Sequence, residues 1–270
     1  MRISRVIFGA AVVASSAGLV TAGAAAPAAG AASAVRYVSL GDSYSSGVGA
    51  GDYISSSGGC DRSTRAYPEQ WAGAHAPASF VSVACSGATT ADVVSSQVSA
   101  LSPGTTLVSI TIGGNDAGFS GVMETCVLGS TSACLNAVST AEAFIAGQLP
   151  ARLTATLQAI RARAPAAKIV LLGYPDLYDL ARSRTCIGLS TRDRTALNGG
   201  ANALDQALAT AATANGATFA DVRGQFARHE ICDSDSWLHA VDIFAISSSY
   251  HPTASGQELG YLPVFTAAAG

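Results

Sequence analysis

Three residues in short polar turns could together hydrolyse an ester. Ser43, in a Gly-Asp-Ser turn, has a hydroxyl that can attack a carbonyl once a base removes its proton. Gly87, in a Cys-Ser-Gly turn, has no Cβ, so its backbone N–H can closely approach an oxyanion. Asn115, in a Gly-Gly-Asn-Asp turn, offers a side-chain N–H worth about 2.7–4 kcal/mol to such a transition state. Taken alone, a Gly-Asp-Ser turn is more typical of a serine that caps the next helix, so the nucleophile depends on the other motifs.

The base that such a serine needs must come from one of four histidines. His75 lies at the tail of a predicted helix, and His229 and His239 lie in a polar loop. His251 stands in a turn just before the last predicted helix, and Pro252 biases it toward an extended backbone. This geometry favours His251 as the base, although a lone histidine is often structural.

Alternating strands and helices must position these side chains. Apolar, β-branched runs predict strands at 37–40, 80–84, 107–112, 168–172 and 218–222. Helical spacing predicts helices at 68–76, 90–101, 137–164 with a break at Pro150, 192–215, and from 252 onward. The segment 126–134 is expected to be a surface loop. The order favours an α/β fold, a three-layer α/β/α sandwich with a mostly parallel sheet of about five strands, whose carboxyl edge would gather the three turns.

The first 34 of the 270 residues resemble an export signal. Arg2 and Arg5 precede an apolar run at 6–20, and small residues continue to Ala34. Cleavage is expected between 26 and 34, and the run is shorter than the about 20 residues of a membrane span. We therefore expect a secreted protein without stable membrane insertion, with one domain at 35–270. A net charge of −3 without a basic run disfavours a nucleic-acid partner.

Six cysteines in an exported chain predict up to three disulfides, with 15 possible pairings. The absence of a Cys-x-x-Cys motif argues against a zinc ribbon or a thioredoxin-type redox site. A cluster of His229, Glu230, Asp233, Asp235 and His239 matches no recognised ligand spacing and is interpreted as a polar surface loop. No metal and no cofactor are expected.

In their order along the chain, Ser43, Gly87, Asn115 and His251 resemble the signature of the SGNH (GDSL-type) hydrolase superfamily. The strings Gly-Asp-Ser-Tyr-Ser-Ser-Gly, Ala-Cys-Ser-Gly-Ala-Thr-Thr and Ile-Gly-Gly-Asn-Asp-Ala-Gly-Phe are similar to its secreted actinobacterial lipase/esterase branch. The resemblance extends from about Tyr37 to the C-terminus and implies an SGNH, flavodoxin-like fold.

This resemblance implies roles for individual residues. Ser43 would be the nucleophile and His251 the general base, while the amides of Ser43 and Gly87 and the side chain of Asn115 would form the oxyanion hole. No cofactor is implied. Sequential pairing of the cysteines carries over as Cys60–Cys85, Cys126–Cys134 and Cys186–Cys232.

The chain departs from the superfamily pattern beside the histidine. The usual Asp three residues before it is Ser248 here, and the nearest preceding acid is Asp242. A main-chain carbonyl of Ser248 or Ser249 could accept the Nδ1–H of His251 and fix its tautomer. We therefore expect a serine–histidine dyad with a backbone carbonyl in place of the acid.

Other residues near the motifs have two interpretations. Asp42 and Asp116 follow glycines and are expected to bond local backbone. Tyr44, Phe119 and Tyr250 could line an acyl pocket or pack in the core.

The function expected is a secreted serine ester hydrolase acting on lipid or other acyl esters: a lipase, esterase, phospholipase A or thioesterase-like enzyme. One alternative is a carbohydrate or small-molecule acetyl esterase, which the lack of an aromatic sugar platform disfavours. The other is a non-catalytic secreted binding domain, which would normally have lost the serine or the histidine. A monomer is the expected state.

Overall fold

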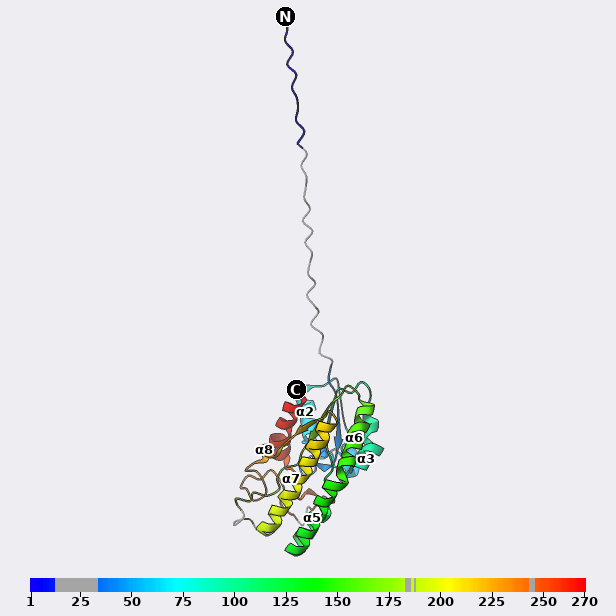
Figure 1. Cartoon of the computed structure of the whole chain (residues 1–270). Coiled ribbons are helices and arrows are strands. Elements are labelled where there is room, and N and C mark those ends of the chain that lie inside the picture. Colours follow the sequence, from blue (N-terminus) through cyan, green and yellow to red (C-terminus); the bar gives the residue numbers. More distant parts are fainter. Residues whose placement is uncertain (13–33, 183–185, 187, 243–245) are drawn as a thin grey trace. The chain divides into compact units, whose positions relative to one another are not determined.

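The structure is a computed structural model that describes residues 1–12, 34–182, 186, 188–242 and 246–270. The chain forms two units, Met1–Ser33 and Ala34–Gly270 (Figure 1). In the first, residues 1–12 form neither helix nor strand. The expected cleavage region lies outside the described residues, so the signal peptide stays a prediction. In the described residues, no helix is both long and apolar enough to cross a membrane.

The second unit is built on a five-stranded parallel sheet, which confirms the predicted α/β class. The strands are β1 (Arg36–Gly41), β2 (Ser79–Ser82), β3 (Leu107–Thr111), β4 (Lys168–Leu172) and β5 (Thr218–Ala220). Their order in the sheet is β2-β1-β3-β4-β5, and every neighbouring pair is parallel. The carboxyl ends of β1 and β3 are therefore adjacent, with Gly41 opposite Thr111.

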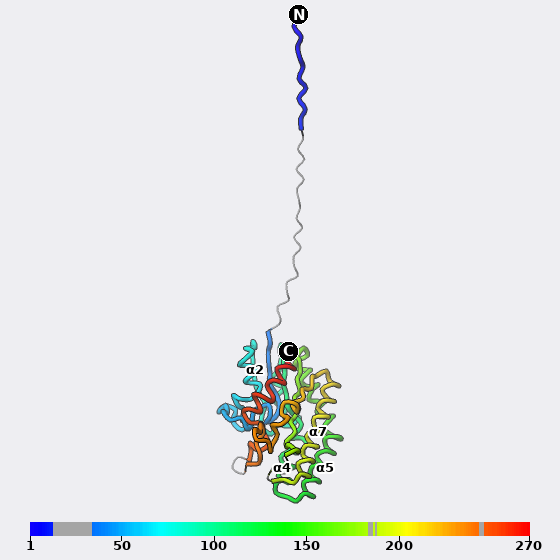
Figure 2. The backbone as a smooth tube through the Cα atoms, turned by 90° about the vertical axis from the view of Figure 1, so that its left-hand side faces the viewer, coloured from blue at the N-terminus to red at the C-terminus, as the bar shows by residue number. Residues whose placement is uncertain are grey.

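Helices cover both faces of this sheet. They are α1 (Ser43–Ser46), α2 (Tyr67–His75), α3 (Thr90–Ser95), α4 (Phe119–Leu128), α5 (Thr131–Gly147), α6 (Leu149–Arg163), α7 (Thr191–Ala214), α8 (Arg223–Phe226) and α9 (Leu262–Ala269). Shorter 3₁₀ turns lie at Ser55–Cys60, Gln97–Ala100 and Ile246–Ser248, and a π-helical segment, Gly256–Tyr261, leads into α9. Figure 2 shows α2 and the C-terminal helix on one side, with α5 and α7 on the other.

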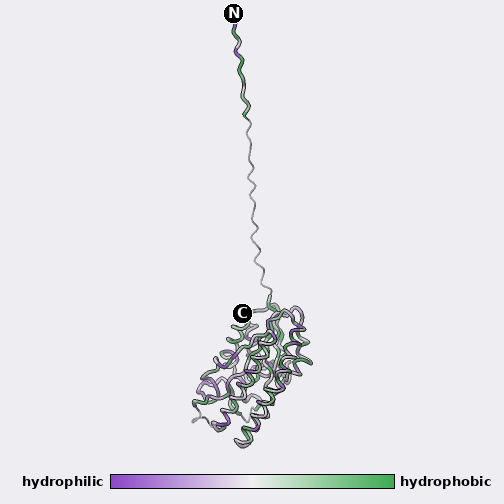
Figure 3. Tube along the Cα trace, in the orientation of Figure 1, coloured by the Kyte–Doolittle hydropathy of each residue, from purple (hydrophilic) through white to green (hydrophobic). Residues whose placement is uncertain are grey.

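The core explains why the strands form where they do. All five residues of β3 are buried, as expected for a strand covered on both faces. The ring of Tyr37 packs against Trp71, Phe80 and Phe265, which joins β1 to the α2–α9 side. Along the helices, hydrophobic and hydrophilic residues alternate (Figure 3), consistent with one face packed on the sheet and one in solvent.

The prediction of a loop at 126–134 was wrong. Cys126 lies in α4 and Cys134 in α5, and two residues, Gly129 and Ser130, connect these helices. The Ser130 side chain caps α5 by accepting the N–H of Ala133. Small polar residues that looked like a loop are therefore helix-terminating residues. Elsewhere, the helix expected at 90–101 is α3 followed by a 3₁₀ turn, and the break expected at Pro150 lies at Gln148.

Candidate active site

The turn after β1 presents Ser43 at the carboxyl edge of the sheet. Gly41 has φ 119°, and a Cβ at this position would lie 2.3 Å from the carbonyl oxygen of Thr111, so only glycine fits. Asp42 then caps α1 by accepting the N–H of Tyr44 at 3.0 Å. Ser43 is the first residue of the helix, and its side chain is placed by this sharp strand-to-helix turn.

Asp42 is more than a local cap. Its carboxylate also accepts the hydroxyl of Thr111 at 2.7 Å and the hydroxyl of Tyr174. Burial raises the pKa of Asp42 to about 6, while the hydrogen bonds from Tyr174, Thr111 and Tyr44 lower it. The carboxylate therefore ties the turn that carries Ser43 to β3 and to the chain after β4.

His251 lies within hydrogen-bond distance of Ser43. Its Nε2 is 2.7 Å from Ser43 Oγ, and its Nδ1 is 3.1 Å from the carbonyl oxygen of Ser249. A carbonyl can only accept, so Nδ1 carries the proton and Nε2 is left as the acceptor for the serine hydroxyl. Burial lowers the pKa of His251 to about 4, which keeps the imidazole neutral and able to take a proton at neutral pH.

The carbonyl within hydrogen-bond distance of Nδ1 is that of Ser249. The Ser248 carbonyl accepts the backbone N–H of His251 at 3.1 Å. Asp242 contacts the same loop by donating its backbone N–H to Ser249 Oγ at 3.0 Å. Both ring nitrogens of His251 are thus engaged by Ser43 and Ser249, neither of which supplies a carboxylate.

Ser43, Gly87 and Asn115, the three residues expected to donate N–H groups to an oxyanion, line the same pocket. Gly87 has φ 77° in a turn closed by the Ala88 N–H on the Cys85 carbonyl at 3.1 Å. Asn115 uses one hydrogen of Nδ2 on the Ala88 carbonyl at 2.9 Å, which leaves its second hydrogen available. Within the described part of the chain, the amides of Ser43 and Gly87 donate no hydrogen bond to another protein group. The arrangement can therefore bind an oxyanion.

These groups belong to a mostly apolar pocket of about 270 Å³. Ser43, Gly87, Asn115 and His251 all line it. Its apolar walls come from α4, α5, α7 and the segment after β4, through Phe119, Val122, Val138, Ala141, Ile145, Pro175, Leu177, Leu197, Ala201 and Leu204. Such a pocket suits an aliphatic chain attached to a carbonyl at Ser43.

The model of the GDSL-like lipase/acylhydrolase family matches residues 39–259. The chain belongs to this family. It is 55% identical to Lipase 1 of Streptomyces coelicolor over 252 residues, which cover 93% of this chain and 92% of that protein. Among solved structures, phospholipase A1 of Streptomyces albidoflavus NA297 is 52% identical with a TM-score of 0.85, and the extracellular lipase of Streptomyces rimosus is 51% identical with 0.84. Each match covers 87% of this chain and all of the solved chain. This lipase/acylhydrolase is therefore a carboxylic ester hydrolase.

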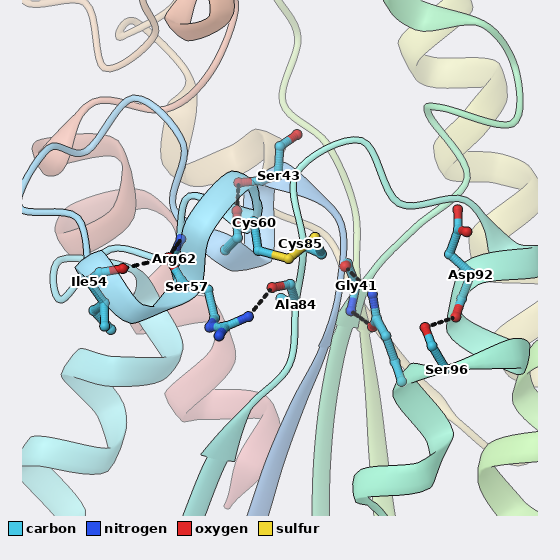
Figure 4. The surroundings of a disulfide bond; sticks show 12 residues. Gly41, Ser43, Ile54, Ser57, Cys60, Arg62, Ala84, Cys85, Asp92 and Ser96 are labelled. Atoms are coloured by element: carbon cyan, nitrogen blue, oxygen red, sulfur yellow. Dashed lines mark hydrogen bonds between the residues drawn. A yellow bond between two sulfur atoms is a disulfide. The ribbon is translucent and has the colours of Figure 1, made fainter.

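In this ester hydrolase, three disulfides join successive cysteines: Cys60–Cys85, Cys126–Cys134 and Cys186–Cys232. The first lies beside the Gly87 turn. Figure 4 shows it with Ser43, close to the carboxyl ends of the strands. Its cysteines also make backbone bonds, from Cys85 N to the Gly41 carbonyl at 3.0 Å and from Ser86 N to the Cys60 carbonyl at 3.1 Å. The disulfide and these two backbone bonds thus hold the Gly87 turn against the end of β1 and against the 3₁₀ turn that ends at Cys60.

Asp116 fixes the turn that carries Asn115. It was expected to bond local backbone, but the backbone N–H that it accepts, at 2.9 Å, belongs to Thr90, 26 residues away, and it also accepts the Thr90 hydroxyl at 2.6 Å. Arg152 on α6 lies 3.4 Å away. This fully buried carboxylate therefore links the turn after β3 to the start of α3 and to α6.

The polar cluster near Cys232 has a structural arrangement. His229 stacks on Trp237 with ring centroids 3.7 Å apart, and its Nδ1 lies 2.8 Å from the Asp235 carbonyl. Among the residues that the structure describes, no group of three or more His, Cys, Asp or Glu side chains is arranged to hold a metal ion. His239, the last residue of the cluster, instead supports the segment that carries His251: its N–H donates to the His251 carbonyl at 3.0 Å, and its carbonyl accepts the Tyr250 N–H at 2.8 Å.

Sequence reasoning missed Tyr174 and left Tyr44 and Tyr250 open. Tyr44 and Phe119 line the pocket. Tyr250 is buried, and its carbonyl accepts the Tyr44 hydroxyl at 2.7 Å. Tyr174 follows β4 in a Gly-Tyr-Pro turn, and its place at the end of a predicted strand was the signal that could have found it.

Proposed function

We propose that this chain is an exported hydrolase of fatty-acyl esters in which Ser43 forms an acyl-enzyme. The observation that carries the proposal is the 2.7 Å contact between His251 Nε2 and Ser43 Oγ, two residues that line a mostly apolar pocket. A neutral imidazole with a fixed tautomer, a hydroxyl and free N–H donors are the parts that acyl transfer needs.

In the acylation step, Ser43 Oγ attacks the ester carbonyl while its proton passes to His251 Nε2. The carbonyl oxygen becomes an oxyanion and accepts hydrogen bonds from the Ser43 and Gly87 amides and from Asn115 Nδ2. The protonated imidazole then gives its proton to the leaving alkoxide, and the C–O bond to the alcohol breaks. The alcohol departs and the acyl group stays on the serine.

Deacylation reverses the roles of the same groups. Water gives a proton to His251 as its oxygen attacks the acyl carbon, and the imidazolium returns that proton to Ser43 Oγ when the acid leaves. The Ser249 carbonyl accepts the Nδ1–H throughout and holds the ring in one tautomer. It supplies a partial rather than a full negative charge to the imidazolium, so orientation is its main contribution.

The apolar pocket favours a fatty acyl chain over an acetyl group. Its walls offer aliphatic and aromatic carbon well beyond the reach of two carbons. The names of the relatives point the same way, since they are lipases and a phospholipase A1. The relative from S. rimosus is named extracellular, which supports export of this chain. The mature enzyme is proposed to begin between 27 and 35 and to be a monomer.

The test is hydrolysis of p-nitrophenyl esters from acetyl to palmitoyl, and of phosphatidylcholine, by the wild type and by Ser43→Ala. We expect activity that rises beyond short chains and is lost in the variant. Equal rates for both proteins on all substrates would reject an enzyme, and a preference for acetyl esters would favour the small-molecule esterase. N-terminal sequencing of the secreted protein tests export.

Two adjacent glycines of α7 allow a matched test of the acyl pocket. Gly200 lines the pocket, and a Cβ there would lie 3.6 Å from Val138 Cγ1, so a leucine would extend into the space. Gly199 does not line it. Gly200→Leu should lower kcat/KM for long esters but spare acetyl esters, while Gly199→Leu should leave the chain-length profile unchanged. If both variants had the same chain-length profile, the acyl chain would have to bind outside this pocket.

A further inference from the structure

One buried phenol connects the turn of the candidate nucleophile to the turn of the oxyanion donor. The Tyr174 hydroxyl donates to Asp42 Oδ2, and Asp42 directly precedes Ser43. The same hydroxyl lies against Gly114, which directly precedes Asn115: a Cβ on that glycine would lie 3.6 Å from the phenol oxygen. Burial raises the pKa of Tyr174 well above its usual range, and a hydrogen bond from the Gly114 backbone opposes part of that rise.

The sheet order explains why a side chain after β4 has this reach. The strands run β1-β3-β4 in this part of the sheet, about 4.8 Å apart, so the turns that follow them lie in a row. Tyr174 lies two residues beyond the end of β4 and spans the turn after β3 to contact the turn after β1. A rigid aromatic side chain with a polar tip can make this connection, whereas an aliphatic residue would leave the carboxylate without one of its donors.

Tyr174 is itself held firmly. Its backbone N–H donates to Asp205 Oδ1 at 2.8 Å, and the carbonyl of Gly173 accepts the Tyr261 hydroxyl at 2.9 Å. Its ring packs edge-on against Tyr44, with the centroids 4.9 Å apart. These contacts hold the Tyr174 side chain in one rotamer, so its hydroxyl has a fixed position, as a positioning group needs.

We propose that Tyr174 is a positioning residue of the ester hydrolase, whose hydroxyl sets the placement of Ser43 relative to Asn115 by bridging Asp42 and Gly114. The inference rests on the proposed roles of Ser43 and Asn115. The phenol makes no proton transfer. It fixes how far the attacking oxygen stands from the donor that receives the developing charge, and misplacement of such groups by about 1 Å can cost about a hundredfold in rate.

The test is Tyr174→Phe, measured on a p-nitrophenyl ester with kcat expressed per active site titrated from the burst of p-nitrophenol. The ring and the pocket wall remain, so we expect KM to stay within about twofold while kcat falls by about 10- to 100-fold. Tyr37→Phe is the matched control. This variant removes the hydroxyl of another buried tyrosine, which lies 2.6 Å from Ser109 Oγ. Tyr37 lies near the start of β1, at the opposite end from the turn that carries Ser43, so kcat should be unchanged.

A double-mutant cycle with Asp42→Asn tests the bridge itself. Asparagine can still cap α1 through its single oxygen, but it places an NH₂ donor where the Tyr174 hydroxyl needs an acceptor, so the variant removes both the charge and the bond from Tyr174. If Tyr174 acts through Asp42, its substitution should lower kcat by a smaller factor in the Asp42→Asn background than in the wild type. Should Tyr174→Phe fail to fold, Asp42→Asn alone must reproduce the fall in kcat at constant KM.

Three results would overturn the inference: an unchanged kcat in Tyr174→Phe, the same fall in Tyr37→Phe, or equal factors in both backgrounds of the cycle. Ser43→Ala separates these failures from failure of the proposed function. If Ser43→Ala is inactive while Tyr174→Phe has the wild-type kcat, only the positioning role is wrong. If Ser43→Ala keeps its activity, the proposed function itself is wrong.

Discussion

Ser43 and His251 share one hydrogen bond but are held in place by different kinds of structure. Ser43 stands on a short turn between two regular elements, and its position follows from a glycine with positive φ and a helix cap next to it. His251 stands in an irregular segment, between the 3₁₀ turn Ile246–Ser248 and the π-helical segment before α9. Its position depends on contacts with distant parts of the chain.

Tyr250, which directly precedes His251, ties this segment to distant parts of the chain. Tyr250 has φ 66°, an uncommon conformation for a bulky residue. Its carbonyl accepts the Tyr44 hydroxyl at 2.7 Å, its N–H donates to the His239 carbonyl at 2.8 Å, and its own hydroxyl lies 2.9 Å from that of Tyr178. Tertiary contacts thus hold the His251 segment in place, whereas a local turn presents Ser43 and tertiary bonds from Thr111 and Tyr174 to Asp42 then fix that turn.

The largest predicted effect tests whether the two regions act as one unit. We expect Ser43→Ala and His251→Ala each to lower kcat by about a million-fold, and the double variant to be no worse than either, as found when a nucleophile and its base work together. Single-turnover rates with a p-nitrophenyl ester would measure this. If the two single reductions in kcat multiplied in the double variant, Ser43 and His251 would contribute independently and would not act as one unit.

The pH dependence of kcat/KM should report the two regions separately. Above pH 6, Asp42 is ionised and His251 neutral, so the enzyme is fully active. As the pH falls through about 6, Asp42 gains a proton and the turn that carries Ser43 loses one of its hydrogen-bond acceptors, which should reduce activity in part. As it falls through about 4, His251 gains a proton and can no longer accept one, so activity should drop about tenfold per pH unit.

Asp42→Asn should remove the upper step of this profile and leave the lower one. A profile recorded between pH 3.5 and 8, on protein shown by circular dichroism to be folded at each pH, would resolve the two. If the variant retained the step near pH 6, that step would belong to a group other than Asp42. If the lower step were absent in the wild type, the assignment of His251 as the base would fail.

A smaller effect is expected from loosening only the His251 region. Tyr44→Phe keeps the aromatic ring in the pocket but removes the hydroxyl that donates to the Tyr250 carbonyl. We expect a fall of about tenfold in kcat, the size of one lost buried hydrogen bond of about 1.4 kcal/mol. Tyr37→Phe, distant from both turns, should show no such fall, and equal kcat values for the two variants would mean that this hydroxyl does not position His251.

The difference between the Ser43 turn and the His251 segment explains how much of the site could be predicted from the sequence. The turn at Gly41 and the five strands are local patterns, and the structure has them where the sequence placed them, with strand ends within two residues. Asp42 bonds local backbone as expected, but it is Asp42 rather than Ser43 that caps the helix. The tie from Tyr174 to Asp42 joins residues 132 apart, and the contact from Tyr44 to Tyr250 joins residues 206 apart. No local pattern encodes such pairs. The loop expected at 126–134 failed for the opposite reason, because its caps were mistaken for loop residues.

The choice between Ser248 and Ser249, which the sequence left open, gives the smallest predicted effects. A backbone carbonyl orients His251, so Ser248→Ala and Ser249→Ala should each keep kcat within about threefold of the wild type, and so should Asp242→Asn. The measurement is kcat and KM on one ester for the three variants beside Ser43→Ala. A collapse in Asp242→Asn would make that carboxylate the third member of the site, and a collapse in either serine variant would mean that its hydroxyl rather than the Ser249 carbonyl holds the ring. Three near-normal variants would show that a main-chain carbonyl suffices here to orient the histidine.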